Sequence, residues 1–87
     1  MNEFERVVRE YISQRGVRTY RELHARVLAT GGFADVRRDE LERTIVGVGA
    51  QRPRAPRINK AIAESLNLSE AERMRMARAA LPGLFAE

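Results

Sequence analysis

Two stretches of the sequence match a helix capping box, in which a Ser or Thr is followed three residues later by Glu. They are Thr19 to Glu22 and Ser69 to Glu72. In this motif the hydroxyl accepts a hydrogen bond from the amide of the Glu, and the Glu carboxylate reaches back to the amide of the capping residue. Two helices therefore begin at defined points, and any fold has to accommodate both.

Apolar residues recur at the spacing of an α-helix in short segments that Gly, Pro or Asn separate. We expect helices over residues 2–14, 19–30, 37–46, 57–66 and 69–80. Asn2 is suited to cap the first helix, while Gly16 and Asn67 are suited to end the first and the fourth. The β-branched run 44–46 leaves a strand as the alternative for the third segment.

The apolar stripes predict which residues face a core. In the second helix they are Tyr20, Leu23, Val27 and Leu28, and in the fifth they are Met74, Ala77 and Leu81. His24 lies beside the first of these stripes, and we assign it a packing or surface role because it has no partner for chemistry. Short helices without a convincing strand pattern predict a compact all-α fold, with residues 1–87 forming one domain.

Composition excludes several kinds of protein. The chain has 87 residues, no Cys and one His, so it has room for one small core but not for a disulfide framework or a thiolate zinc site. We expect no enzyme, no cofactor and no metal, because no nucleophile is placed with a base. The N-terminus lacks the apolar stretch of a signal peptide, and no run could span a membrane. We expect a cytoplasmic, nucleoid-associated protein.

Positive charge is concentrated in one loop. The chain has 16 basic and 12 acidic residues, and no acid lies between Glu42 and Glu64. That interval contains Arg43, Arg52, Arg54, Arg57 and Lys60. Gly and Pro residues make 47–56 a surface loop, and arginines there without acidic neighbours predict contact with a polyanion. A GC-rich genome is an alternative reason for the preference for Arg over Lys, but not for its location.

Four stretches together resemble one family of DNA-binding domains. Residues 19–23 match a Thr-x-x-Glu-Leu opening of a second helix, and residues 36–41 match the start of the recognition helix that follows. Residues 62–73 look like the junction of the fourth and fifth helices, and residues 52–54 resemble a basic, proline-containing loop of some phage repressors. In this order and spacing, the chain resembles the lambda-repressor-like, Cro-type helix-turn-helix family, also called the XRE family, over nearly its whole length.

The resemblance implies a five-helix domain that binds double-stranded DNA in a sequence-specific way. The helix-turn-helix would span about 19–46, the basic loop 47–57, the C-terminal helices 57–81 and a short apolar tail 82–87. The chain would be a transcriptional regulator, and we expect a repressor that binds an inverted-repeat operator as a dimer.

The third helix would then enter the major groove, where Arg reads guanine and Asp or Glu accepts from cytosine. The expected base-reading residues are Arg37, Arg38, Asp39, Glu42 and Arg43. The expected phosphate contacts are Tyr20, Arg21, Arg52, Arg54 and Arg57. The alternative for the third helix is that its acids simply pair with its arginines on an exposed surface.

The C-terminal part of the chain is the expected dimer interface. Its candidate residues are Met74, Met76, Leu81, Leu84 and Phe85. The alternative is that Met74 and Leu81 are core residues and that the tail folds back on its own domain. A second candidate function, an antitoxin or adaptor that binds a partner protein, would use the same helix and tail.

Three features depart from the usual pattern of the family. The turn at 29–35 is longer, the loop at 47–56 is longer, and Arg37 occupies the position of the usual Ser or Thr cap. Asp35 could cap a third helix that begins slightly earlier. The register of the recognition helix depends on which of the two residues is the cap.

Overall fold

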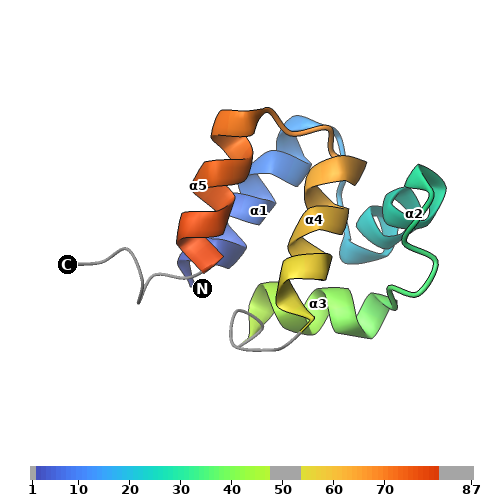
Figure 1. Cartoon of the computed structure of the whole chain (residues 1–87). Helices are drawn as coiled ribbons and strands as arrows, with labels where there is room; N and C mark the ends of the chain where they lie inside the picture. The colour runs from blue at the N-terminus through green and yellow to red at the C-terminus, as the bar shows by residue number, and fades with distance from the viewer. Residues whose placement is uncertain (1, 48–53, 81–87) are drawn as a thin grey trace.

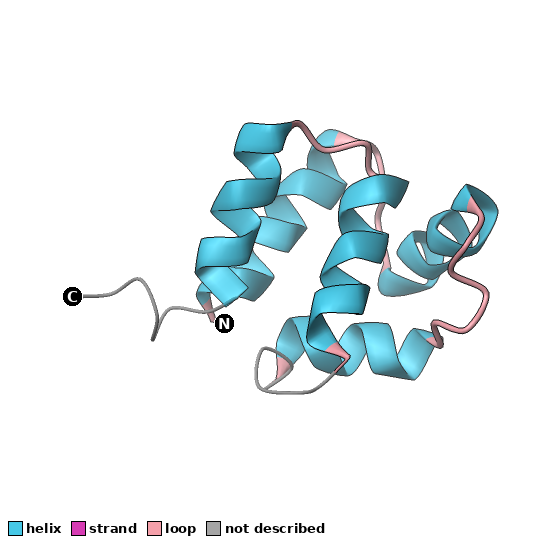
Figure 2. Cartoon of the chain, viewed as in Figure 1, coloured by secondary structure: helices cyan, strands magenta, loops and turns pink. Residues whose placement is uncertain are grey.

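The computed structural model describes residues 2–47 and 54–80, and within these ranges the chain forms only helices and loops (Figure 2). The helices are α1 Glu3–Gln14, α2 Tyr20–Thr30, α3 Arg38–Val46, α4 Ala55–Ser65 and α5 Glu70–Ala80. The predicted all-α fold is confirmed. Residues 44–46 form the end of α3, so the strand alternative is wrong. No helix in the described ranges is long and apolar enough to cross a membrane.

The capping box at Ser69 forms in full, and the one at Thr19 forms in part. Thr19 Oγ1 accepts from the amide of Glu22 at 3.1 Å, and Ser69 Oγ accepts from the amide of Glu72 at 3.1 Å. The Glu72 carboxylate returns to the Ser69 amide at 2.8 Å, as expected. The Glu22 carboxylate instead accepts from the amide of Arg18 at 2.7 Å, one residue before the cap. Both helix starts are thus fixed by two hydrogen bonds each.

The other predicted helix ends are also present, except at α3. Asn2 accepts from an amide in the first turn of α1 at 2.7 Å. Gly16 and Asn67 end α1 and α4 with φ angles of 75° and 54°, in the left-handed region. Arg37 is the N-cap of α3 and makes no side-chain capping bond. Asp35 does not cap α3, because its carboxylate is bound by arginines of another segment.

The helices pack in pairs around one core. α1 lies beside α5 and α2 beside α4, while α3 lies crosswise and packs against α1, α2 and α4 (Figure 1). The largest fully buried side chains come from the first four helices and from the turn before α3: Val7, Val8, Leu23, Val27, Val36, Leu41, Ile45, Ile58 and Ile62. The connection 31–37 contributes Phe33 and Val36 to this core and exposes its other residues, so α2, the connection and α3 form one edge of the molecule.

α4 begins at Ala55, two residues earlier than expected. Pro56 lies in its first turn, where a missing amide has no cost because the first amides of a helix have no partner within it. The loop expected over residues 47–56 therefore ends before Ala55. Arg54 is the N-cap of α4 and Arg57 belongs to its first turn, so both are held on a helix.

Two of the expected core faces are wrong in part. Leu28 is 45% exposed although it was assigned to the core. In α5, Met74 is 49% exposed and Ala77 is also exposed. The buried residues of α5 are Met76, Ala79 and Ala80. This second set also has helical spacing, so periodicity alone did not distinguish the two faces. Leu81 lies outside the described residues.

Candidate nucleic-acid interface

α3 packs on the core with one face and presents the other to solvent. Leu41, Thr44 and Ile45 are buried. All the expected base-reading residues are exposed: Arg37, Arg38, Asp39, Glu42 and Arg43. Because the buried face fixes the rotation of the helix, these side chains project to the same outer side of the molecule. Their role at base edges stays a prediction.

The ion pairs on this outer face centre on Asp39. Its carboxylate lies 3.2 Å from Arg43 Nη2 and 3.6 Å from Arg37 Nε. Arg38 and Glu42 make no ion pair with any described residue. Exposed pairs of this kind contribute at most about 1 kcal/mol. An incoming phosphate or base can therefore replace Asp39 as the partner of either arginine.

A shallow depression runs along α2 and reaches the start of α3. Its lining residues are Arg21, His24, Ala25, Leu28, Arg38 and Asp39. Arg21 comes from the first turn of α2 and Arg38 from the first turn of α3, so the structure brings together one expected phosphate contact and one expected base reader. His24 Nε2 lies 2.8 Å from the carbonyl oxygen of Val36, which confirms its packing role.

Several arginines in the described ranges have no carboxylate partner. They are Arg18, Arg21, Arg26, Arg38, Arg73 and Arg78. Arg18 and Arg21 flank the N-terminus of α2, and Arg38 is the first residue of α3. The N-terminal end of a helix is itself positive, so these side chains add to two helix dipoles. The same first turns also contain Glu22, Asp39 and Glu40, so the arginines without a carboxylate partner are what suits the edge formed by α2 and α3 to bind anions.

Tyr20 does not extend into solvent as an expected phosphate contact would. Its hydroxyl donates to the buried carboxylate of Glu5 at 3.4 Å, and its ring lies 5.6 Å from the guanidinium carbon of Arg9. Burial raises the pKa of the Tyr20 hydroxyl. These contacts tie the start of α2 to α1, which gives Tyr20 a structural role. Arg21, its neighbour, is exposed.

The arginines at the start of α4 are bound by carboxylates of the α2–α3 connection and of α3. We call Asp35, Glu40, Arg54 and Arg57 the Asp35 cluster. Arg57 binds both oxygens of Asp35, at 2.6 and 2.8 Å, and Arg54 Nη2 donates to Asp35 at 2.9 Å. Arg54 also binds both oxygens of Glu40, one of them at 3.0 Å.

Hydrogen bonds from Arg57 first, and from Arg54 second, hold the pKa of Asp35 far below its usual range. The hydrogen bond from Arg54 lowers the pKa of Glu40 in the same direction. The expectation that no acid lies near these arginines is therefore wrong. Their positive charges are balanced within the domain, and the phosphate role predicted for them loses its basis. Arg52 lies outside the described residues.

The two described residues of the expected dimer interface differ in burial. Met74 is exposed, but Met76 is 2% exposed and belongs to the core, so its expected surface position is wrong. Leu81, Leu84 and Phe85 lie outside the described residues. Met74 is the one member of the expected interface that the described structure places on the surface.

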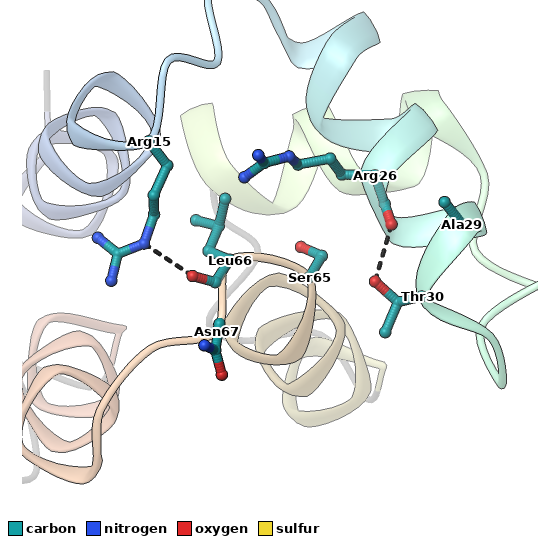
Figure 3. Close-up of a pocket in the computed structure, with 7 residues that line it drawn as sticks. All are labelled: Arg15, Arg26, Ala29, Thr30, Ser65, Leu66 and Asn67. Atoms are coloured by element: carbon teal, nitrogen blue, oxygen red, sulfur yellow. Dashed lines mark hydrogen bonds between the residues drawn. The ribbon is translucent and has the colours of Figure 1, made fainter.

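A second depression lies where α1, α2 and α4 end. Arg15 and Arg26 line it together with the C-terminal residues of α4, as Figure 3 shows. The guanidinium of Arg15 already has hydrogen-bond partners, because it donates to the carbonyl oxygen of Leu66 at 2.7 Å and to Glu72 at 3.0 Å. The C-terminal end of α4 adds partial negative charge. This depression is therefore less suited to an anion than the one between α2 and α3.

The described residues contain no group of His, Cys, Asp and Glu side chains that could hold a metal ion. Comparison with protein-family models, with curated proteins and with solved structures finds no match.

Sequence reasoning missed two residues of the exposed edge and the two acids that bind the arginines of α4. Arg18 and Leu28 belong to the exposed edge, but Arg18 lies outside the expected helix and Leu28 follows a core residue, Val27. Asp35 and Glu40 were not linked to the arginines of α4, which are far away in the sequence. A search for acids near the start of the third helix would have suggested such pairing, without identifying which arginines take part.

Proposed function

We propose that this chain is a sequence-specific double-stranded DNA-binding protein of the lambda-repressor-like helix-turn-helix type, acting as a transcriptional regulator. The single observation that supports this most is the depression between α2 and the start of α3. There Arg21 and Arg38, which make no ion pair with a described residue, lie on one exposed edge, while the buried face of α3 anchors the helix in the core. Two of the four stretches that resemble the XRE family, residues 19–23 and 36–41, overlap the starts of the same two helices.

The proposed division of contacts follows from position. Arg21 and Arg18, at the N-terminus of α2, meet phosphate, where the helix dipole adds to their charge. Arg38 and Arg43, on the outer face of α3, read guanine through paired acceptors. Glu42, which has no ion-pair partner among the described residues, accepts from the amino group of cytosine.

The exposed side chain of Leu28 adds an apolar contact to this surface. It lines the same depression as Arg38, with Ala25 beside it. The methyl group of thymine is the one apolar feature of base edges in the major groove. A site that contains guanine next to thymine fits the combination of an arginine and a leucine on one edge.

We further propose that the protein acts as a repressor and binds two half-sites of an inverted repeat as a dimer. Half-sites of this kind lie about 34–36 Å apart, one turn of the DNA helix. The exposed Met74 of α5 supports a second surface on which two copies could meet.

In vitro selection from a random duplex library tests the proposal. We expect enrichment of a short motif, repeated with inverted symmetry if the dimer is correct. Affinity for the selected duplex should fall steeply as salt rises, because each neutralised phosphate releases counterions. Failure to bind either random or genomic DNA at low salt would show that the proposed function is wrong.

A further inference from the structure

The connection between α2 and α3 is tied to α4 by two arginines, of which Arg57 makes more contacts and Arg54 adds one hydrogen bond to Asp35. Arg57 binds Asp35 with both ends of its guanidinium fork, and the same group donates to the carbonyl oxygen of Gly32 at 2.7 Å. Its guanidinium carbon lies 5.0 Å from the centre of the Phe33 ring. One side chain thus contacts three residues of the connection 31–37.

The connection has few means of holding its own shape. Gly31 and Gly32 both have φ angles of 86°, which Gly adopts at little cost. Within 31–37 the backbone makes one hydrogen bond, from the amide of Val36 to the carbonyl of Phe33 at 3.0 Å. The buried side chains of Phe33 and Val36 fix two points of the chain. Of the exposed residues between and around them, Gly32 is bound by Arg57, and Asp35 is bound by Arg57 and Arg54.

Asp35 lies close to the start of α3. It lies two residues before Arg37, the N-cap of α3, which has no capping bond of its own. Arg54 extends the same network into the first turn of α3 through Glu40. The start of α4 therefore holds both the connection and the N-terminal end of α3.

We propose that Arg57 and Asp35 form a clasp that sets the orientation of α3 toward DNA, so that both are positioning residues for sequence preference and not phosphate contacts. This inference rests on the proposed function. A guanidinium bound to a carboxylate by two parallel bonds has a fixed geometry. Contacts from Arg to guanine require similarly narrow geometry, whereas long side chains can follow a shifted phosphate. Loss of the clasp should therefore impair sequence preference before it impairs general DNA binding.

The experiment compares Arg57→Lys and Asp35→Asn with the wild-type chain, and uses Lys60→Ala as the control. Lys keeps the charge of Arg57 but lacks its fork, and Asn keeps the size of Asp35 but lacks its charge. Lys60 lies on the exposed side of the same helix, 4.0 Å from Glu64 and outside the cluster. Three quantities are measured: the affinity ratio of the selected to a scrambled duplex, the salt slope, and amide hydrogen exchange in residues 33–37.

For both clasp variants we expect the affinity ratio to fall about tenfold, the size of one lost bidentate base contact. The salt slope should not change, and exchange in 33–37 should become faster relative to α5. Lys60→Ala should leave the affinity ratio and the exchange rates unchanged. A clasp that served stability alone would weaken binding to both duplexes equally and leave their ratio unchanged.

Two results would overturn the proposed role of the clasp. One is an Arg57→Lys variant with the wild-type ratio and exchange rates. The other is an Arg57→Ala variant that keeps the ratio but lowers the salt slope by about 0.9, the mark of one lost phosphate contact. If the wild-type chain binds no duplex, the proposed function fails together with this role. If the wild type selects a site and Arg57→Lys matches it, only the clasp fails.

Discussion

Arginines gather in two regions of this molecule, and the structure uses them differently. At the starts of α2 and α3, Arg21 and Arg38 are exposed and make no ion pair with a described residue. At the start of α4, Arg54 and Arg57 are bound by Asp35 and Glu40. Among the described arginines of these two regions, only those of the first have no carboxylate partner.

The difference shows that charge along the sequence is a poor guide to charge on a surface. The interval between Glu42 and Glu64 contains no acid, yet its described arginines meet carboxylates from residues 35 and 40. The region around Arg38 is rich in acids by sequence, but Asp35, Asp39 and Glu40 bind other arginines, and Glu42 makes no ion pair with a described residue. Packing determines which arginines and carboxylates form ion pairs, and it places α4 against α3.

Both regions depend on the same anchor, because α3 is attached to the core through Leu41. This side chain is fully buried, so Leu41→Ala should lower the free energy of unfolding by about 2–5 kcal/mol. The matched change Leu28→Ala, at a leucine that is 45% exposed, should lower it by no more than about 0.5 kcal/mol. Urea unfolding followed by circular dichroism measures both. Equal losses would mean that the two leucines are not divided between core and surface.

The exposed region should determine sequence preference through Arg38. Replacing it with Ala should cost about 1–3 kcal/mol of discrimination at one base pair of the selected site. Arg26→Ala is the matched control, because Arg26 is also exposed and also lacks a carboxylate partner among the described residues but lines the other depression. Competition binding with single-base variants of the selected duplex measures the effect. If both variants change the preference alike, Arg38 has no special place at the base edges.

The two regions should also differ in their response to salt. Arg21→Ala should weaken binding to all duplexes about equally and reduce the salt slope by about 0.9, since one phosphate contact is lost. Arg54→Ala should leave the slope near its wild-type value, because Arg54 is already neutralised by Asp35 and Glu40. Fluorescence anisotropy over a range of salt concentrations gives both slopes. A reduced slope for Arg54→Ala alone would reverse the assignment of the two regions.

Most of the fold was predictable because its signals are local. Capping boxes, helical stripes and left-handed stops act over a few residues, and they placed every helix in the described ranges within two residues of its position. The inward face of α5 was not predictable in the same way. Met74 with Ala77 and Met76 with Ala79 and Ala80 both have helical spacing, and only the packing against α1 selects the second set.

The candidate site was predictable only where it depends on local structure. The exposure of Arg38 and Glu42 follows from the stripe of Leu41 and Ile45, which fixes one face of the helix. The pairing of Arg57 with Asp35 joins residues 22 positions apart, and no local signal encodes it. The half-burial of Tyr20 likewise depends on Glu5, from a different helix.

The smallest expected effect concerns acid sensitivity, and it tests whether the Asp35 cluster holds the folded chain together. The pKa of Asp35 is lower in the folded chain than the usual value of about 3.9. A carboxyl group of this kind stabilises the fold above its unfolded pKa, and the stabilisation is lost as pH falls toward the folded value. The midpoint of thermal unfolding should therefore fall on acidification below about pH 4, and fall less steeply in Asp35→Asn.

The same measurement can separate the cluster from the exposed region. In an Arg57→Gln background, Asp35→Asn should have a smaller effect on the acid response, because the largest cause of the lowered pKa is already gone. In an Arg38→Gln background, Asp35→Asn should change the acid response as much as it does in the wild-type chain, since Arg38 makes no ion pair with Asp35. Thermal unfolding from about pH 5 to pH 2 covers the relevant range. If the two backgrounds respond alike, the charges of the two regions are not independent, and the division between a bound and an available set of arginines does not hold.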